Sequence, residues 1–369
     1  MSPVEVSTML REWLVALING GDAPWPSGLA YDVPAVVTAL QSEGIAVLAC
    51  QRMSGSKFAF PQALHDALQS AARESAMHSL QLDAETRRVL TVLAQAGLPC
   101  LLLKGSALAY WLYDSPALRE RVDIDLLLTS RGQAEQAADA LLPLGYCLRE
   151  REIPGDLTTY EITCVREVAG ALVELDLHWD IGGAPVFASR ITPAELFGES
   201  IPLSRLSGDA RGPEAVHAFL NAAMHRSLNL HLDGDRLKWL YDFDLLARSF
   251  SPAQCRRLID LSTGRGLAGT CLSALLASQD VFGSAMPAWV TVELREQAAL
   301  EAIDASRMGE WRYIQRKNLQ ALPGLGMRVR WLRQRLLPAP GYLQDMYGSP
   351  GLRGWSRYLV HGFRKLLSR

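Results

Sequence analysis

The spacing of apolar residues changes twice along this chain of 369 residues. From about residue 61 to 96, and again from residue 213 onward, apolar positions recur every three or four residues, as on one face of an α-helix. Between residues 100 and 179, short apolar runs bounded by Gly or Pro have the pattern of β-strands. This change of period predicts an α+β fold, with a small mixed β-sheet between helical flanks.

A chain of this length is expected to form two or three packed units. We predict a helical N-terminal unit at 1–96, a core with the sheet at 97–206, a helical C-terminal unit at 207–320 and a basic, aromatic-rich tail at 321–369. Strands are expected at 100–103, 122–128, 146–151, 158–165 and 171–179, with an edge strand at 201–203. Helices are expected at 61–96, 107–113, 133–142, 213–228, 235–250, 252–280 and 287–320.

Two aspartates lie in the strand predicted at 122–128. Asp123 and Asp125 alternate with Val122, Ile124 and Leu126, so their side chains are expected on the same face of the strand. Adjacent carboxylates repel each other, and a divalent cation between them would offset that repulsion. A third acidic position follows in VELDLHW (173–179), where Asp176 and Glu174 share one strand face.

A Lys104-Gly105-Ser106 turn joins the first predicted strand to a helix. A Gly-Ser turn at a helix N-terminus presents backbone N–H groups and a hydroxyl to phosphate oxygens. Three aspartates on neighbouring strands supply the hard oxygen ligands of two Mg²⁺ ions, with Mn²⁺ as the alternative. Together these parts suit transfer of a nucleoside monophosphate, a reaction that needs positioning and charge neutralisation.

The segment LLLKGSALAYWLYDSPALRERVDIDLLL (101–128) resembles the core of the nucleotidyltransferase superfamily, the fold of DNA polymerase beta. More narrowly, the chain resembles a bacterial family described as uncharacterised nucleotidyltransferases, often encoded near peptide or polysaccharide biosynthesis genes. The matching positions are Lys104-Gly105, Leu118-Arg119, Asp123-Ile124-Asp125-Leu126, Asp176-Leu177-His178-Trp179, Trp239-Leu240 and Asp242.

The resemblance implies a Mg²⁺-dependent enzyme that transfers a nucleoside monophosphate from a triphosphate, ATP or GTP, to an acceptor and releases pyrophosphate. It implies Asp123, Asp125 and Asp176 as catalytic metal ligands, with Asp176 as base or base-positioner. Gly105 and Ser106 would meet the phosphates, with Lys104 or Arg119 helping. The acceptor and the preferred base do not follow from the sequence.

Four further residues are site candidates. Glu174 is an alternative to Asp176, and Lys238 and Asp242 lie in the helical region that closes over the nucleotide in this fold. His178 is a poor ligand for Mg²⁺ and is expected to orient a carboxylate or to pack beside Trp179. Two alternatives without a role in the site are equally open. Lys104 could lie in solvent at the sheet edge, and Asp242 could form a hydrogen bond between two helices. The spacing of His217, His225 and His231 does not favour zinc.

The charge is unevenly distributed. Residues 316–369 hold eleven Lys and Arg and one acidic residue, whereas the remainder holds 26 basic and 38 acidic residues. A basic tail with interleaved aromatic residues suits contact with nucleic acid, with an anionic membrane surface or with the acidic body itself. Two alternative functions remain open: a non-catalytic triphosphate-binding scaffold of a biosynthetic complex, and a toxin-like enzyme that modifies tRNA.

No apolar run reaches the ~18 residues of a membrane span, and the N-terminus lacks the pattern of a signal peptide. A cytoplasmic location is expected. The six cysteines are scattered without metal-ligand spacing and are expected to be reduced.

Overall fold

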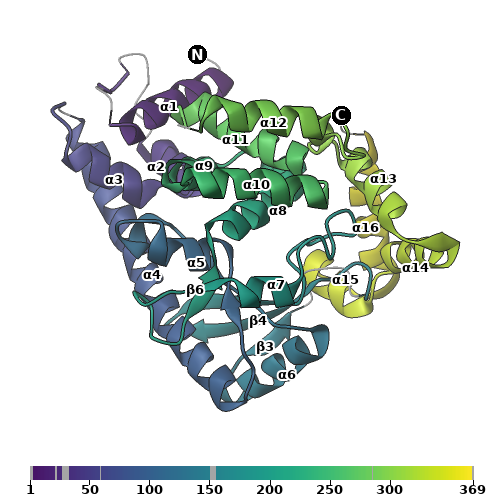
Figure 1. Ribbon diagram of the computed structural model, residues 1–369. Coiled ribbons are helices and arrows are strands. Elements are labelled where there is room, and N and C mark those ends of the chain that lie inside the picture. Colours follow the sequence, from purple (N-terminus) through teal and green to yellow (C-terminus); the bar gives the residue numbers. More distant parts are fainter. Residues whose placement is uncertain are drawn as a thin grey trace.

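The computed structural model describes residues 3–20, 23–26, 33–58, 60–149, 155–284 and 286–367. It confirms the α+β class: a five-stranded mixed sheet lies among helices from both ends of the chain (Figure 1). The strands are β1 Leu101–Leu102, β2 Asp123–Leu127, β3 Cys147–Arg149, β4 Glu161–Val168 and β5 Ala171–His178. Their order in the sheet is β1-β2-β5-β4-β3.

The pairing of β2 with β5 is parallel, and the other three pairings in this sheet are antiparallel. Strands β3, β4 and β5 form the antiparallel meander that the Gly- and Pro-bounded runs predict. The parallel pair has consecutive register from Asp123 opposite Glu174 to Leu127 opposite His178. Two segments that are 51 residues apart in sequence therefore lie side by side at the centre of the sheet.

A strand is present near the predicted position 201–203, but the prediction that it adds to the edge of the main sheet is wrong. Strand β6, Ser200–Pro202, pairs with β7, Arg211–Pro213, in a separate two-stranded sheet. The hydrogen bond from Leu203 N to Ala210 O closes the connection between them. Because this hairpin satisfies its own backbone groups locally, it does not extend the main sheet.

The N-terminal helices are α1 Pro3–Ile18, α2 Val33–Glu43, α3 Ala46–Ser54 and α4 Gln62–Gln95. The segment predicted at 61–96 is a single helix of 34 residues, which ends where Gly97 adopts a φ of +70°. Its C-terminal half packs on the sheet: Val89 and Leu93 belong to the same buried cluster as Leu126 and Leu175. Helix α4 thus joins the N-terminal helices to the strands (Figure 1).

The helices inside the core are α5 Lys104–Trp111, α6 Arg131–Leu141 and α7 Pro193–Gly198, with 3₁₀ turns at Pro116–Leu118 and Leu142–Leu144. The helix expected at 107–113 begins three residues earlier, so Lys104, Gly105 and Ser106 form its first turn instead of a preceding loop. Ser130 caps α6 by accepting a hydrogen bond from Gln133 N, as its position predicts.

The C-terminal helices are α8 Ala215–Asp233, α9 Leu237–Ser249, α10 Pro252–Arg265, α11 Ala268–Phe282, α12 Ala288–Ala298 and α13 Trp311–Ala321, with a 3₁₀ turn at Ala305–Arg307. The segment 252–280 forms two helices because Gly266 takes a left-handed conformation, φ +62°, and ends α10. Helix α8 begins after Glu214, whose carboxylate accepts hydrogen bonds from the N–H groups of Val216 and His217.

The segment described from its sequence as a tail is helical. It forms α14 Gly324–Leu336, α15 Pro340–Tyr347 and α16 Gly351–Leu367, which lie beside α13 at the edge of the molecule (Figure 1). Tyr342 and Leu343 of α15 are buried against Trp355 and Tyr358 of α16. Many apolar side chains of α14 and α16 nevertheless remain exposed.

Three large apolar clusters hold the described residues together, and each of them crosses an expected unit boundary. One joins Leu103 and Leu127 at the end of the sheet to Phe219 and Phe243 of the C-terminal helices. Another joins the N-terminal helices to Leu237 and Leu240 of α9. Taken singly, no described helix is both long and apolar enough to cross a membrane; α2 and α3 pass that test only together, across a bend of 116°.

Candidate active site

The parallel pairing of β2 and β5 brings the predicted carboxylates together. Asp125 lies opposite Asp176 in the register, and Asp123 lies opposite Glu174. The apolar residues between them, Ile124 and Leu175, are buried in the sheet core. Asp123 and Asp125 line the same cavity, as expected for alternate positions of one strand.

Asp125 is the most strongly paired of the three aspartates. Its Oδ1 accepts hydrogen bonds from Lys104 Nζ at 2.7 Å and from His178 Nε2 at 2.9 Å. Burial alone would raise the pKa of this carboxyl, but the charges of Lys104 and His178 hold the pKa below its usual range. Asp125 is therefore ionised at neutral pH.

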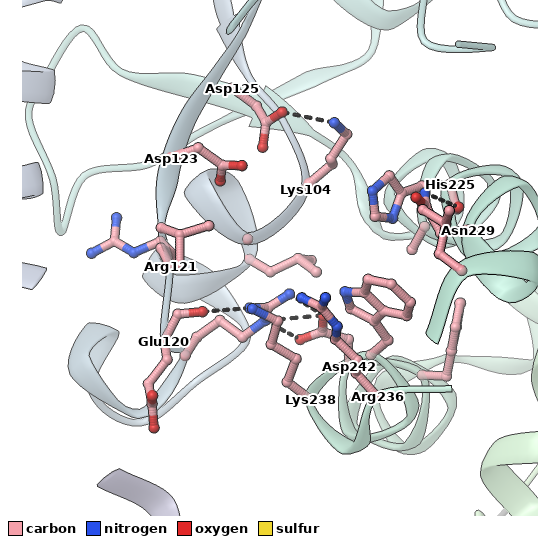
Figure 2. Close-up of a pocket in the computed structure, with 18 residues that line it drawn as sticks. Lys104, Glu120, Arg121, Asp123, Asp125, His225, Asn229, Arg236, Lys238 and Asp242 are labelled. Atoms are coloured by element: carbon pink, nitrogen blue, oxygen red, sulfur yellow. Dashed lines mark hydrogen bonds and ion pairs between the residues drawn. The ribbon is translucent and has the colours of Figure 1, made fainter. Parts of the chain in front are cut away.

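Lys104 reaches Asp125 from the first turn of α5. Its backbone has a φ of 46°, an uncommon value for a residue with a side chain. Burial disfavours the ammonium, yet the carboxylates of Asp125, Glu161 and Asp123 raise its pKa above the ordinary value. With 23% of its side chain exposed, Lys104 does not extend from the sheet edge into solvent; it points at the aspartates (Figure 2).

His178 links two carboxylates from different strands. Its Nε2 lies 2.9 Å from Asp125 Oδ1, and its Nδ1 lies 2.9 Å from Glu161 Oε2. Burial and Lys104 lower the pKa of the imidazole, but Glu161 and Asp125 raise it to about 10. His178 is thus a buried imidazolium in contact with both Asp125 and Glu161.

Asp176 carries a proton more readily than Asp125 does. Burial, followed by the charges of Glu161 and Asp125, raises the pKa of its carboxyl to about 8. Asp176 Oδ1 accepts a hydrogen bond from Thr163 Oγ1 at 2.8 Å. Burial and neighbouring Asp125 also raise the pKa of Asp123, to about 6. The side chain of Asp123 makes no hydrogen bond within the described residues.

The carboxylate oxygens of these aspartates are suitable ligands for a divalent cation. Among the described residues, one oxygen of Asp125, one of Asp176 and both of Asp123 have no hydrogen-bond partner, although these carboxyls lie close together. The candidate ligand atoms of Asp125, Asp176 and His178 lie within 4.8 Å of one another, so these three residues could hold a metal ion. The sequence predicted Asp123 as the third ligand; this group contains His178 in its place, and His178 could bind a metal only after losing the proton that makes it an imidazolium.

The first turn of α5 faces the same region. A Cβ on Gly105 would lie 3.2 Å from the guanidinium of Arg119, so glycine allows Arg119 to approach the helix closely. The Ser106 hydroxyl is buried and contacts β2, donating to Asp123 O at 3.2 Å and accepting from Asp125 N at 3.4 Å. The N–H groups of a first helical turn have no partners within the helix.

Arg119 is held by Asp242 of α9. Arg119 Nε lies 2.8 Å from Asp242 Oδ1, and Arg119 Nη2 lies 2.7 Å from Asp242 Oδ2. Tyr113 donates a further hydrogen bond to Asp242 Oδ1 at 2.6 Å. All three side chains are buried, so Asp242 joins the segment that follows α5 to α9.

A first cavity of about 210 Å³ lies between α5 and helices α8 and α9. Figure 2 shows Asp123, Asp125 and Lys104 at one end and Lys238, Arg236 and Asp242 at the other. Lys238 is 9% exposed and has no hydrogen-bond or ion-pair partner within the described residues. Burial and then Arg119 lower the pKa of its ammonium to about 8.

The wall of this cavity also carries His225 and Trp239. The two rings meet edge to face with centroids 5.3 Å apart, and the Arg236 guanidinium lies 5.3 Å from the Trp239 ring centroid. Burial, followed by the charge of Lys104, lowers the pKa of His225 to about 3, so the imidazole is neutral. This end of the cavity combines positive charge with a flat aromatic surface.

A second cavity of about 560 Å³ lies on the other side of Asp123 and Lys104, which line both cavities. Asp176, Glu161 and His178 form the part of its wall that belongs to the sheet. The opposite wall comes from α13 and includes Trp311, Gln315 and Asn318. The carboxylates of β2 and β5 therefore lie at the boundary between two cavities.

Sequence reasoning missed part of this arrangement. Glu161 of β4 pairs with His178, and Thr163 of β4 donates a hydrogen bond to Asp176. In the sequence, the only indication that these two side chains share a strand face is their alternation with the apolar residues Ile162 and Cys164. Glu174, a candidate on the face of Asp176, is not among the residues that line either cavity.

A second group of potential metal ligands, Glu199, Glu214 and His217, lies away from both cavities. Here Arg257 and Arg265 pair with Glu199 and Glu195, and Glu195 and Glu214 each lie about 3 Å from a ring nitrogen of His217. The negative charge of this group is therefore balanced by side chains of the protein itself.

Comparison with known proteins identifies the family of the chain. No curated protein matches the chain. One matching solved structure is the solution structure of the antibiotic-resistance factor ANT(2'')-Ia, at 14% identity and a TM-score of 0.37, which covers 52% of this chain and 95% of that chain. The sequence profile of a family described as "Uncharacterised nucleotidyltransferase" matches residues 30–283. This match spans most of the chain, which therefore belongs to the uncharacterised nucleotidyltransferase family.

Proposed function

We propose that the protein transfers a nucleoside monophosphate from ATP or GTP to a hydroxyl or phosphate oxygen of an acceptor and releases pyrophosphate. The observation that carries the proposal is the position of Asp123, Asp125 and Asp176 at the boundary between two cavities. A reaction between two bound molecules needs such a boundary, because the reacting atoms of both must meet there.

Asp123, Asp125 and Asp176 would hold Mg²⁺ or Mn²⁺, with His178 orienting Asp125 from behind. When bound, such ions neutralise negative charge on the triphosphate and favour ionisation of an acceptor hydroxyl. The carboxylate oxygens left without partners support this assignment, and two of the three aspartates belong to the group that could hold a metal.

The first cavity would take the nucleoside triphosphate. Arg119 and Lys238 bring positive charge to it, and Lys104 and Gly105 of the first turn of α5 line it, where a helix N-terminus favours an anion. Because Asp242 fixes the Arg119 guanidinium through three hydrogen bonds, Arg119 would meet the phosphates in a fixed orientation. Trp239 offers a flat surface on which a base can stack.

The second cavity would take the acceptor. The acceptor oxygen would form a bond to the α-phosphorus, and the bond between the α-phosphorus and the bridging oxygen of the pyrophosphate would break. Asp176 would act as the base or would position the acceptor hydroxyl. Its carboxyl, with a pKa raised to about 8, is ionised once a bound cation displaces its proton, and the hydroxyl proton would then pass to this carboxylate or to solvent water.

We propose a role in this reaction for each of the four units predicted from the sequence. Residues 97–206 would supply the carboxylates, and residues 207–320 would supply Lys238 and the aromatic wall of the nucleotide cavity. The helices of residues 1–96 would support both, and residues 321–369 would border the acceptor cavity through Arg335.

The test uses the full chain with cell extract, Mg²⁺ and NTPs labelled at the α-phosphate. We expect label to pass to an extract component, and Asp123→Asn to abolish this transfer. Asp123 is the safest of the three to change, because it has no hydrogen-bond partner in the described structure whose loss would unfold the protein. Asp139→Asn, an exposed position on α6, is the matched control and should transfer normally.

The outcomes separate the alternatives. Equal transfer by wild type and Asp123→Asn would overturn the metal assignment. Triphosphate binding without transfer would indicate a scaffold. Label in RNA, with binding that weakens steeply as salt rises, would indicate an enzyme that modifies RNA.

A further inference from the structure

An apolar groove lies where the proposed acceptor cavity ends. It has a volume of about 740 Å³ and lies between α13, α14 and α16, which are neighbours at the edge of the molecule (Figure 1). Its walls include Leu332, Leu336 and Val360, whose side chains are 41%, 55% and 52% exposed. Within the described part of the chain, no segment covers these side chains. A groove with this much exposed apolar surface is typical of a binding site.

The groove adjoins the second cavity. Trp311, Gln315 and Arg335 line both, so a ligand that passes these three side chains would occupy the two spaces together. At this junction Gln315 Oε1 is buried and accepts no hydrogen bond from the described residues. Buried acceptors without a partner are rare in folded proteins, and this one would take a hydroxyl or N–H group of a ligand.

The lining of the groove selects the chemistry of its occupant. Beyond the junction, the walls are mainly the apolar parts of Trp331, Leu332, Leu336, Leu359 and Val360. The hydroxyl of Tyr358 already donates to Arg335 O at 2.5 Å. The backbone amides of an extended peptide would find few partners here, whereas a hydrocarbon chain needs none.

We infer that the acceptor is amphipathic: its polar head, which carries the reacting oxygen, lies in the second cavity, and its hydrocarbon chain lies in the apolar groove. This inference rests on the proposed nucleotidyl transfer and names the substrate class of the same site. The bonds that form and break are those of that transfer, with the head oxygen joined to the α-phosphorus and pyrophosphate leaving. The groove contributes binding, and Gln315 accepts a hydrogen bond from the head.

The first experiment measures binding of n-hexyl and n-octyl β-glucoside, which have a hydroxyl-rich head and an alkyl chain, below their micelle concentrations. Two additional methylene groups in an apolar site are expected to strengthen binding by about tenfold. Val360→Asp places a charge in the groove and should remove this gain. Leu352→Asp is the matched control, since Leu352 lies on the same helix, is 83% exposed and does not line the groove.

Equal affinity for the two glucosides, or equal loss in both variants, would overturn the inference. Binding to phosphatidylglycerol vesicles that both variants weaken equally, without the chain-length gain, would instead indicate that α14 and α16 contact a membrane surface.

A second experiment separates this inference from the proposed function. The labelled product formed from cell extract is partitioned between water and butanol, and we expect it in butanol. A labelled product that stays in water would overturn the amphipathic acceptor and leave nucleotidyl transfer intact. Chain-length-dependent glucoside binding with no labelled product from any extract would overturn nucleotidyl transfer, and with it the role of the groove ligand as acceptor.

Discussion

Asp125 of β2 and Asp176 of β5 lie opposite each other in a parallel register, yet their carboxyls hold protons very differently. Lys104 and His178 donate to Asp125 and hold its pKa below the ordinary range. Burial and the charges of Glu161 and Asp125 raise the pKa of Asp176 to about 8. One member of the pair is thus a fixed anion, and the other can exchange a proton near neutral pH.

This difference predicts how metal binding depends on pH. A metal ion binds the deprotonated carboxylate, so below pH 8 it must displace the proton of Asp176. We expect the affinity for Mn²⁺ to rise by about tenfold per pH unit between pH 6 and 8 and to level off above pH 8. Titration followed by the electron paramagnetic resonance of free Mn²⁺ measures this directly. An affinity that is constant from pH 6 to 9 would contradict the assignment of Asp176.

Arg119 and Asp242 form a buried ion pair that joins the loop after α5 to α9. Asp242→Asn removes the charge that compensates the guanidinium and should lower the free energy of unfolding by about 3–5 kcal/mol. Urea denaturation measures this change.

An exposed ion pair serves as the control for the buried pair of Arg119 and Asp242. Arg131 and Glu135 form an i, i+4 pair on α6 with about half of each side chain in contact with solvent. Glu135→Gln should change the free energy of unfolding by less than about 0.5 kcal/mol. Similar effects of Asp242→Asn and Glu135→Gln would show that the buried pair does not hold the two elements together.

Much of this arrangement follows from the sequence, because strand alternation is a local property. The strand face on which Asp123, Asp125 and Asp176 lie follows from their apolar neighbours in sequence, which are buried on the opposite face. Pairing partners are not local, which is why the strand at 201–203 was assigned to the wrong sheet and why Glu161 was missed as the partner of His178. The helices of residues 324–367 were obscured by the prolines and glycines between them, although α16 is amphipathic.

The lowered pKa of Lys238 predicts that the protein takes up a proton when it binds a nucleotide. Burial and Arg119 lower the pKa of its ammonium to about 8, and a bound triphosphate would raise that pKa again. Between pH 8 and 9.5 the protein should therefore take up a proton when ATP or GTP binds. Calorimetry in buffers of different ionisation enthalpy measures this uptake.

Two variants test the source of that proton. Lys238→Met should remove the uptake and weaken triphosphate binding by about tenfold, the effect of losing one charged hydrogen bond. Lys57→Met, an exposed position outside both cavities, should bind like wild type. An undiminished proton uptake in Lys238→Met would exclude Lys238 as the group that titrates.

His178 predicts how stability depends on pH. Its folded-state pKa of about 10 exceeds the ordinary histidine value, so its ion pairs with Asp125 and Glu161 stabilise the protein fully below about pH 6.5. This stabilisation is lost as the pH rises through 10, because the unfolded imidazole is then neutral and the folded one must lose its proton too. We expect the unfolding free energy of wild type to exceed that of His178→Gln at pH 6, and the difference to shrink steadily toward pH 10. Urea denaturation in the presence of EDTA tests this, since the chelator prevents metal ions from compensating the carboxylates. A difference that stays constant from pH 6 to 10 would mean that His178 packs as a neutral ring and does not supply the charge that keeps Asp125 ionised.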